Sequence, residues 1–319
     1  MIRGIRFEGA PFDLSAVCLG TARFGGGYDD DKSFSILDRY YAMGGRFLDT
    51  ANVYGRWSPS GLNESERTVG RWLKTRGITD MIVTSKCCHY APDARDVSRV
   101  NRASAMADLE QSRRSLGMDT IPVYLTHRDN PDTDIREIVD FLWDMVKEGK
   151  VSRFGFSNYK AERIRAALDY LGEDWREVMI GVSDEWSLHA ECLTADAGGE
   201  REAPDGMVTT GRSLKKLFAE EGMPLLAFAA AGGGFYSKLA DGRIPPEKAG
   251  PSDRAVMERL RALSAESGMS LGALSLAYVL NAGLPAIPIS AVSDEKQLED
   301  FEAASAWVGD LSGLSPLRG

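Results

Sequence analysis

The sequence has few cysteines and histidines, no long apolar run and no excess of positive charge. Only 4 cysteines occur among 319 residues, too few for a disulfide framework, and the adjacent Cys87 and Cys88 lack the spacing of metal ligands. No stretch approaches the roughly 18 apolar residues of a membrane span, and the N-terminus has no signal-peptide pattern. We therefore expect a cytoplasmic protein with reduced thiols, no bound metal and no membrane contact.

The charge balance is acidic, because 38 Lys and Arg residues face 47 Asp and Glu residues, for a net charge of −9. Phosphate contacts need clustered Lys and Arg, so this chain is a poor partner for nucleic acid. The hydrophobic fraction of 43% is ordinary for a globular protein, and the chain is long enough to bury a large core. Its length allows either two domains or one α/β barrel.

Short apolar segments alternate with longer helical patterns along the chain. The apolar segments are rich in β-branched and aromatic residues, which predicts strands buried on both faces, as in a parallel sheet. These predicted strands span residues 16–21, 45–50, 81–86, 121–126, 151–157, 178–183, 224–229 and 285–290. Helices are predicted at residues 65–76, 99–116, 135–148, 160–171, 210–221, 253–267, 270–281 and 295–305. A first helix follows three aspartates, with Asp31 as candidate N-cap, and ends at the glycines 44–45.

Eight strands that alternate with helices predict a doubly wound sheet or a (β/α)8 barrel. The number of strands and the absence of a G-x-G-x-x-G dinucleotide motif favour the TIM barrel, formed by residues 1–319 as a single domain. Residues 3–12 predict an N-terminal β-hairpin across the barrel bottom. The irregular stretch 187–209 predicts a long loop at the C-terminal face, where barrel enzymes place their active sites.

Side chains suited to acid–base chemistry stand at or just after the ends of the predicted strands: Asp49, Tyr54, Lys86 and His127. An ammonium beside a phenol favours the phenolate, so Lys86 is expected to lower the pKa of Tyr54. Asp49 would hold Lys86 charged, and His127 would orient a substrate oxygen. Such a set can protonate a carbonyl oxygen, which contributes about 10²–10⁴-fold to a rate. None of these groups can supply a hydride, so a cofactor is required.

Several ordered segments resemble the aldo-keto reductase family. The stronger matches cover the first five predicted strands and are LGTARFG (19–25), FLDTANVYG (47–55), NESERTVGRWL (63–73), IVTSK (82–86), VYLTHRD (123–129) and GFSNY (155–159). Looser matches follow at residues 185–191, 226–238 and 289–300. The resemblance implies that Asp49, Tyr54, Lys86 and His127 form the family's catalytic tetrad. Tyr54 would then be the general acid in reduction and the general base in oxidation.

The resemblance also implies which residues hold a nicotinamide dinucleotide. Ser157 and Asn158 match residues that bind the carboxamide, and Ser183 stands where the family usually has Gln. Trp186 matches an aromatic residue that stacks on the nicotinamide ring. The other matches are Thr21 beside the cofactor, Ala231 and Gly233 in the loop that crosses the pyrophosphate, and Ser293 and Gln297 at the adenosine end.

The choice between the two nicotinamide cofactors depends on that adenosine-end segment. Its acids Asp294 and Glu295 precede the cation Lys296, which suits NADH, since the 2′-phosphate of NADPH usually binds cations. The family favours NADPH, and we expect NADPH rather than NADH.

Arg23, Trp57 and Arg128 are the residues that we expect to contact substrate. A small polar, sugar-like aldehyde or ketone, or its alcohol, is predicted from a polar and aromatic pocket rim, and Arg23 and Arg128 also suit an anionic substituent. The rim residues are Tyr28, Trp57, His89, Arg128, Trp186 and His189. Two alternatives stay open: a cofactor-binding regulatory barrel with little turnover, and a non-redox barrel enzyme in which Lys86 forms a Schiff base. A homo-oligomer stays open as well.

Overall fold

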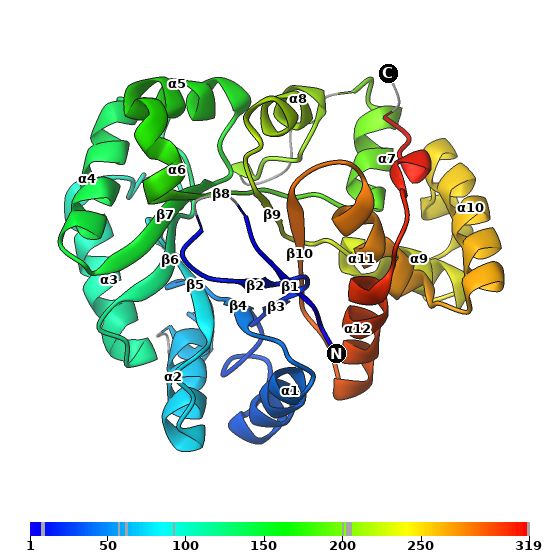
Figure 1. Ribbon diagram of the computed structural model, residues 1–319, viewed down its shortest axis with the longest axis horizontal. Helices are drawn as coiled ribbons and strands as arrows, with labels where there is room; N and C mark the ends of the chain where they lie inside the picture. Colours follow the sequence, from blue (N-terminus) through cyan, green and yellow to red (C-terminus); the bar gives the residue numbers. More distant parts are fainter. Residues whose placement is uncertain are drawn as a thin grey trace.

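The centre of the molecule is a closed barrel of parallel strands, surrounded by helices (Figure 1). The computed structural model describes residues 1–7, 10–56, 58–60, 63–91, 93–199, 201 and 206–317. Around the ring the strands follow the order β10-β3-β4-β5-β6-β7-β8-β9, so each strand pairs with its neighbour along the chain and the ring closes between β10 and β3. This is the (β/α)8 TIM barrel that the alternation of strands and helices predicted.

Each predicted strand overlaps one strand of the barrel, and β5 (Ile82–Cys87) alone extends beyond its predicted segment, by the one residue Cys87. The barrel strands are β3 (Cys18–Gly20), β4 (Phe47–Asp49), β5 (Ile82–Cys87), β6 (Ile121–Thr126), β7 (Val151–Ser157), β8 (Met179–Ser183), β9 (Leu225–Ala227) and β10 (Ala286–Ser290). The helices that match predicted ones are α1 (Asp30–Ala42), α2 (Glu64–Arg76), α3 (Arg102–Leu116), α4 (Ile135–Lys147), α5 (Ala161–Leu171), α8 (Arg212–Glu221), α10 (Pro251–Ser267), α11 (Leu271–Asn281) and α12 (Leu298–Ala306). The sequence patterns missed α6 (Trp175–Val178), α7 (Leu188–Asp196) and α9 (Phe235–Ala240).

Two local expectations need correction. The N-cap of α1 is Asp29, whose carboxylate accepts the Lys32 amide at 2.9 Å, and Asp31 lies inside the helix. The stretch 187–209 is not irregular throughout, because α7 begins there after the N-cap Ser187, which accepts the Ala190 amide at 3.1 Å. The buried side of α7 mixes polar with apolar residues, so no apolar stripe marked it as a helix.

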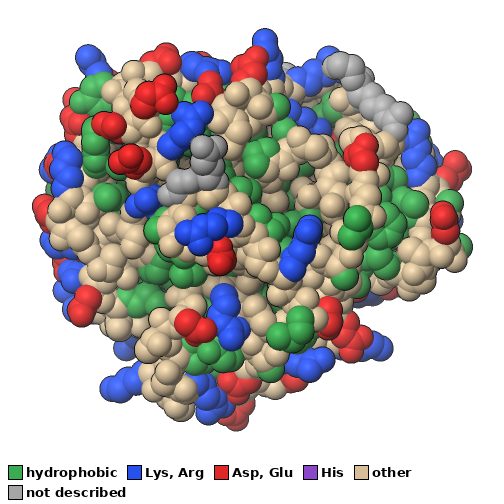
Figure 2. Space-filling model, viewed as in Figure 1, with side chains coloured by type: hydrophobic (Ala, Val, Ile, Leu, Met, Phe, Trp, Pro, Cys, Tyr) green, Lys and Arg blue, Asp and Glu red, His purple; other side chains and the backbone are tan. Residues whose placement is uncertain are grey.

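The N-terminal hairpin is present and closes the bottom of the barrel. Strands β1 (Gly4–Ile5) and β2 (Leu14–Ser15) pair antiparallel, so the hairpin extends three residues beyond the predicted stretch 3–12. Leu14 packs in a cluster with the inward-facing Phe47, Val123 and Ile287 of the barrel. In Figure 1 the hairpin crosses the open end of the ring, and Figure 2 shows that this face carries acidic and basic side chains interspersed.

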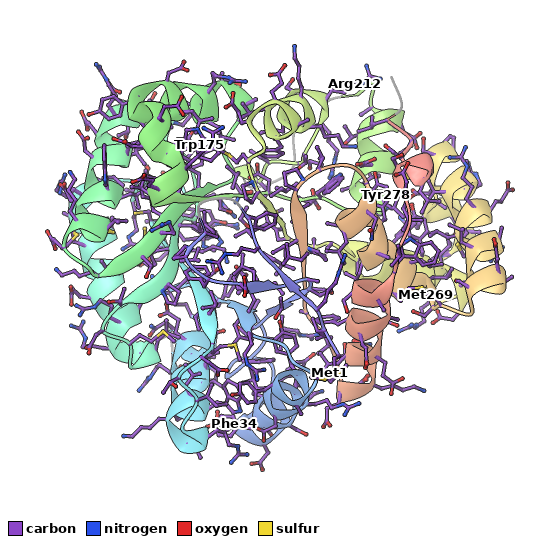
Figure 3. All side chains as sticks on the ribbon, in the orientation of Figure 1. Met1, Phe34, Trp175, Arg212, Met269 and Tyr278 are labelled. Carbon is purple, nitrogen blue, oxygen red and sulfur yellow. The ribbon has the colours of Figure 1, made fainter. Side chains whose placement is uncertain are left out.

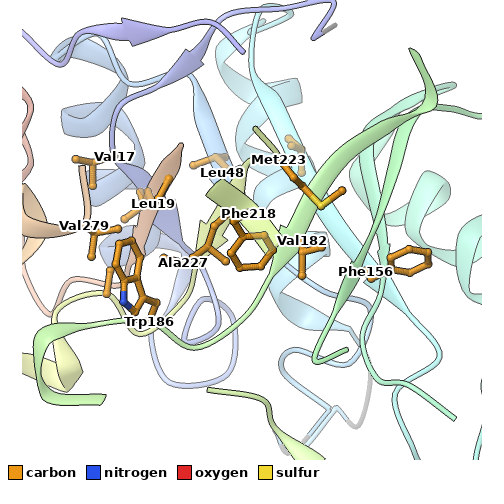
Figure 4. Packing of buried hydrophobic residues seen from close by; sticks show 14 of the residues in the cluster. Val17, Leu19, Leu48, Phe156, Val182, Trp186, Phe218, Met223, Ala227 and Val279 are labelled. Carbon is orange, nitrogen blue, oxygen red and sulfur yellow. The ribbon is translucent and has the colours of Figure 1, made fainter. Parts of the chain in front are cut away.

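A larger apolar cluster lies between the strands and the helices. Figure 4 shows part of it, including Leu48, Phe156 and Val182 from three of the barrel strands. All four cysteines are buried and free, as expected. Among the residues that the structure describes, no single helix is long and apolar enough to cross a membrane, and α10 with α11 passes that test only as a pair bent by 102°.

Candidate active site

The alternation of side chains along the strands brings the predicted catalytic residues into the barrel. On β4, Phe47 faces the barrel interior and Leu48 faces the helices, so Asp49 faces inward again. On β5 the outward residues Val83 and Cys87 alternate with the inward Lys86 in the same way. Asp49 and Lys86 stand at the C-terminal ends of their strands, which is where a barrel concentrates reactive groups.

Lys86 and Asp49 form a buried ion pair at that end of the barrel. Lys86 Nζ lies 2.6 Å from Asp49 Oδ1 and donates to the Thr50 carbonyl at 2.8 Å, and only 3% of Lys86 is exposed. Burial opposes the charge of Lys86, but Asp49 and Tyr54 outweigh it and raise the pKa of the ammonium. Burial also raises the pKa of Asp49, against the lowering effect of Lys86. Lys86 is therefore a fixed ammonium at neutral pH.

Tyr54 lies beside this ion pair, with Lys86 Nζ 5.0 Å from the centroid of its ring. We expected Lys86 to lower the pKa of Tyr54, but burial raises that pKa more than the Lys86 charge lowers it. The expectation omitted desolvation, which favours the neutral phenol over the phenolate. Tyr54 consequently keeps its proton at neutral pH in the protein alone.

His127 completes the group and is held as a neutral imidazole. Its ring meets the Tyr54 ring edge to face at 5.7 Å and the His89 ring at 4.7 Å. Burial, followed by the charge of Lys86, lowers the pKa of His127 well below its usual value. Nδ1 of this buried ring has no hydrogen-bond partner within the described part of the chain. A neutral imidazole keeps one donor and one acceptor nitrogen, so His127 can hydrogen-bond a substrate oxygen.

These four side chains line one cavity of about 780 Å³, together with five other residues that the sequence singled out. The five are Arg128, Ser157, Asn158, Ala231 and Gly233. Ala229 and the glycines 232–234 all have positive φ, so this small-residue loop turns sharply beside the cavity. Without bulky side chains, such a loop lets an anion approach its backbone N–H groups closely.

Asn158 lines the cavity, but its amide already has partners. Its side chain donates to the His127 carbonyl at 3.1 Å and accepts the Val208 amide at 3.0 Å. Its backbone has a φ of 65° and donates to the Asp184 carboxylate at 2.7 Å. Asp184 is fully buried, and burial raises its pKa well above the usual value. Asp184 thus supports the unusual backbone of Asn158, a role that the sequence did not indicate.

Three predicted cofactor contacts are buried in the protein and do not line the cavity. Thr21 is fully buried and donates to the Asp49 carbonyl at 3.0 Å, and Ser183 is fully buried with no partner for its hydroxyl in the described structure. Trp186 is also fully buried, beside Val279 in Figure 4. Its indole N–H bonds Glu191, and its ring packs at 5.7 Å against Tyr278, which Figure 3 labels on α11. The expected stacking on nicotinamide conflicts with this placement, because the indole has no accessible face.

Of the described residues expected at the adenosine end and at the substrate, Arg128 lines the cavity and the others are exposed. Ser293 and Gln297 are exposed and bond each other, from the Ser293 amide to Gln297 Oε1 at 2.7 Å. Arg23 does not line the cavity. Its guanidinium instead lies 5.2 Å from the centroid of the Tyr28 ring. The Tyr28 hydroxyl donates to the Val292 carbonyl at 3.2 Å, which places Arg23 beside the adenosine-end segment. Trp57 lies outside the described residues.

The residues that line the cavity suit a nicotinamide dinucleotide. One end has the buried imidazole nitrogen of His127 and the Ser157 hydroxyl, which can donate as well as accept. The small-residue loop follows, and Ser290 and Ala291 lead from the cavity to the exposed segment near Tyr28. The N-terminal turn of α1 adds Lys32 there, 4.1 Å from the Tyr28 ring centroid.

Sequence reasoning missed much of the substrate side of the cavity. Tyr90, Arg95 and Met207 line it, and so does His89, which the sequence placed only in the pocket rim. Burial lowers the pKa of His89 to about 4, so this ring is neutral as well. The first three follow barrel strands in long loops, and that position is the only signal that could have found them.

Comparisons with known proteins give the family and the fold of the chain. The model of the aldo/keto reductase family matches residues 16–308. The chain is 26% identical to norsolorinic acid reductase B of Dothistroma septosporum, over 84% of this chain and 68% of that protein. It is 27% identical to the uncharacterized oxidoreductase YrpG of Bacillus subtilis, over 90% and 86% of the two chains. A glycerol dehydrogenase structure from Gluconobacter oxydans superimposes with a TM-score of 0.75 at 21% identity, covering 98% of this chain and 94% of that one.

Proposed function

Because this chain belongs to the aldo/keto reductase family, we propose that it is a nicotinamide-dependent carbonyl oxidoreductase in which Tyr54 transfers the proton. The observation that carries the proposal is the buried Lys86–Asp49 ion pair beside Tyr54, in one cavity with His127. The reaction would be reduction of an aldehyde or ketone to its alcohol, or the reverse oxidation.

The four side chains divide the work of proton transfer. A bound nicotinamide cofactor would supply the hydride, which no side chain can deliver. In reduction, Tyr54 donates its phenolic proton to the carbonyl oxygen and becomes a phenolate, which the Lys86 ammonium stabilises. Asp49 holds that ammonium in place. The neutral His127 donates an N–H to the same oxygen and orients the carbonyl; in oxidation the proton returns to Tyr54.

The cofactor that we propose is NADPH rather than NADH. Ser157, Asn158 and the small-residue loop at Ala231 and Gly233 would hold its nicotinamide and pyrophosphate parts. Its 2′-phosphate needs cations, and Arg23 and Lys32 at Tyr28 add two to the lone Lys296 of the adenosine-end segment. This differs from the sequence-based view of Arg23 as a substrate contact.

The substrate that we propose is a small polar, sugar-like aldehyde or ketone, or the corresponding alcohol. The support is a cavity that His89, Arg128 and Asn158 line together with Tyr54, and Arg128 also suits an anionic substituent. The printed name of the structural neighbour, a glycerol dehydrogenase, agrees with a polyol-type substrate. Cytoplasmic location, a single domain over residues 1–319 and the oligomeric state stay predictions.

The proposal is tested by mixing the protein with NADPH and a panel of aldoses, keto sugars, sugar phosphates and aldehydes. Loss of NADPH absorbance with at least one carbonyl, and not with its matching alcohol, is the expected result. Titration of NADPH and NADH by fluorescence quenching then ranks the two cofactors. A protein that binds NADPH tightly but turns over none of the panel would favour the regulatory barrel instead.

The rival Schiff-base mechanism needs a neutral amine at Lys86. The raised pKa of Lys86 in its ion pair with Asp49 opposes this, because a protonated amine is no nucleophile. Borohydride treatment in the presence of an aldehyde decides the point: mass spectrometry would show an adduct on Lys86 only if the rival is right.

A further inference from the structure

The small-residue loop, residues 229–234, presents only part of its surface to the active-site cavity. Ala231, Gly233 and Gly234 line the cavity, whereas Gly232 does not. A Cβ atom at Gly232 would meet the Cβ atom of His189 at 3.0 Å, so this side of the loop lies against α7. The sequence placed His189 in the pocket rim, but the structure places it behind the loop, outside the cavity lining.

The backbone of this loop has an unusual shape that its own residues stabilise weakly. Ala229 and the glycines 232–234 all have positive φ. Glycine loses more conformational freedom on folding than any other residue, so three in a row hold no single shape by themselves. Within the loop, the Gly232 amide donates to the Ala229 carbonyl at 2.7 Å and the Gly234 amide to the Ala231 carbonyl at 2.9 Å. Such a loop depends on anchors at its ends.

His189 and Asp253 provide an anchor at the C-terminal end of the loop. The His189 ring lies flat on the Phe235 ring, with centroids 3.6 Å and planes 9° apart. His189 Nδ1 lies 2.9 Å from Asp253 Oδ1, and the Tyr236 hydroxyl donates to the same oxygen at 3.0 Å. Phe235 and Tyr236 are the first two residues of α9, directly after the loop. The pair therefore holds both residues that continue the loop into α9.

Asp253 is a fully buried carboxylate at the start of α10. Burial raises its pKa, but the hydrogen bonds from His189, the Gly250 amide and the Tyr236 hydroxyl outweigh this and lower the pKa below its usual value. Asp253 is therefore an anion at neutral pH, and the His189 N–H donates to it.

Helix α7 contributes a second contact to the same place. The Cys192 thiol, three residues after His189 and so on the same face of α7, lies 3.2 Å from the Tyr236 hydroxyl. Helices α7 and α10 pack against each other, and α9 lies near them on the right of Figure 1. Polar contacts from two helices thus meet at the start of α9.

We propose that His189 and Asp253 are positioning residues, which hold the small-residue loop in the shape that accepts the pyrophosphate of the cofactor. The inference rests on the proposed function and extends it, because neither side chain lines the cavity. A loop that is ordered before the ligand arrives binds more tightly, since less freedom is lost on binding. The pair should therefore act on every ligand that carries the pyrophosphate.

The test compares three variants. His189→Ala removes the ring contact with Phe235 and the hydrogen bond to Asp253, at a side chain that is 21% exposed. His189→Asn is the rescue variant, because the amide nitrogen of Asn can replace Nδ1 as the donor to Asp253. Arg254→Ala is the matched control on α10, since Arg254 is exposed and donates to the Ala249 carbonyl at 2.7 Å.

The measured quantity is the dissociation constant of three ligands. NADPH and NADH are titrated by fluorescence quenching, and 2′-phospho-ADP-ribose, which lacks the nicotinamide, is titrated by calorimetry. In His189→Ala we expect all three constants to rise about tenfold, because the three ligands share the pyrophosphate. His189→Asn should return to within about threefold of the native values, and Arg254→Ala should match them.

A kinetic measurement separates positioning from general damage. With a carbonyl substrate that the native protein reduces, KM for NADPH should rise with the dissociation constant in His189→Ala. At saturating NADPH, kcat should stay within about twofold of the native value, because the tetrad is untouched. A loss of kcat as large as the rise in KM would overturn the inference.

The inference is also overturned if His189→Ala binds all three ligands as tightly as the native protein, or if only NADPH binding weakens. His189→Asn binding no better than His189→Ala would overturn it as well. If the native protein binds none of the three ligands, the proposed function itself fails, and that outcome needs no variant to be seen. Should His189→Ala fail to fold, Tyr236→Phe removes one hydrogen bond to Asp253, keeps the ring, and should raise the three constants about threefold.

Discussion

The two ends of the active-site cavity are built in different ways. At the tetrad end, Asp49 and Lys86 stand on neighbouring strands, nearly fully buried, in an ion pair of 2.6 Å. At the adenosine end, Ser293 and Gln297 lie exposed on a short turn, and the cations beside them come from another part of the chain. Chemistry that depends on exact proton positions rests on rigid strands, whereas cofactor selection rests on loops that substitution can alter at little cost to the barrel.

The largest test of this comparison is Lys86→Met, which breaks the ion pair at the rigid end. Asp49 would be left as an unpaired buried carboxyl, so we expect a loss of about 3–5 kcal/mol in the free energy of unfolding, along with activity. Chemical denaturation measures the loss. Lys216→Met is the control, because Lys216 is largely exposed and should change stability by less than about 0.5 kcal/mol. If Lys86→Met had the same free energy of unfolding as the native protein, the Lys86–Asp49 ion pair would not stabilise the tetrad end.

The next test is Tyr54→Phe, which removes the acid and leaves the ring. We expect kcat to fall by about 10²–10⁴-fold, because the proton donor is lost. The dissociation constant for NADPH, measured by fluorescence, should stay within about twofold, since the phenol is distant from the adenosine end. Tyr170→Phe removes an exposed hydroxyl that donates to Asp140 and should change neither value. Native kcat in Tyr54→Phe would refute the mechanism.

The pH profile is a finer test of the same end. Reduction needs the protonated phenol, which exists below the pKa of Tyr54, and burial raises that pKa above its usual value of 10. We therefore expect reductive kcat/KM to stay flat up to about pH 10 and to fall only above the raised pKa of Tyr54, by about tenfold per pH unit. Oxidation needs the phenolate and should rise with pH over the same range. A fall in reduction already at neutral pH would contradict the burial effect at Tyr54.

The smallest effect is expected at the adenosine end, from Arg23→Ala. If Arg23 helps to hold a 2′-phosphate, the dissociation constant for NADPH should rise about five- to tenfold while that for NADH stays unchanged. Fluorescence titration of both cofactors measures this, with Arg136→Ala as the exposed control. If the dissociation constants for NADPH and NADH rose equally, Arg23 would not act on the 2′-phosphate. The free energy of unfolding should stay unchanged in Arg23→Ala, in contrast to the loss expected for Lys86→Met. That contrast would support the view that the tetrad end is held by buried contacts and the adenosine end is not.

The cavity contains all four residues of the predicted tetrad, but only some of the predicted cofactor contacts line it. Asp49, Lys86 and His127 follow apolar strand segments, and the period of two along a strand decides which way they face. Trp186 follows a strand as well, but whether its indole meets the cofactor or the core depends on Glu191 and Tyr278 from α7 and α11. The short helices α6, α7 and α9 were missed because packing against neighbours, rather than an apolar stripe, stabilises them.

The sequence by itself determined the eight-stranded barrel, the strand ends that carry Asp49, Lys86 and His127, and the family. These follow from local periodicity and from residues at strand ends, which are properties of short segments. Only the tertiary structure decided that burial raises the pKa of Tyr54, that Arg23 packs against Tyr28, whose hydroxyl bonds Val292, and that His189 meets Asp253 behind the small-residue loop. Desolvation and through-space contacts depend on segments far apart in the chain, so no local pattern could have contained them.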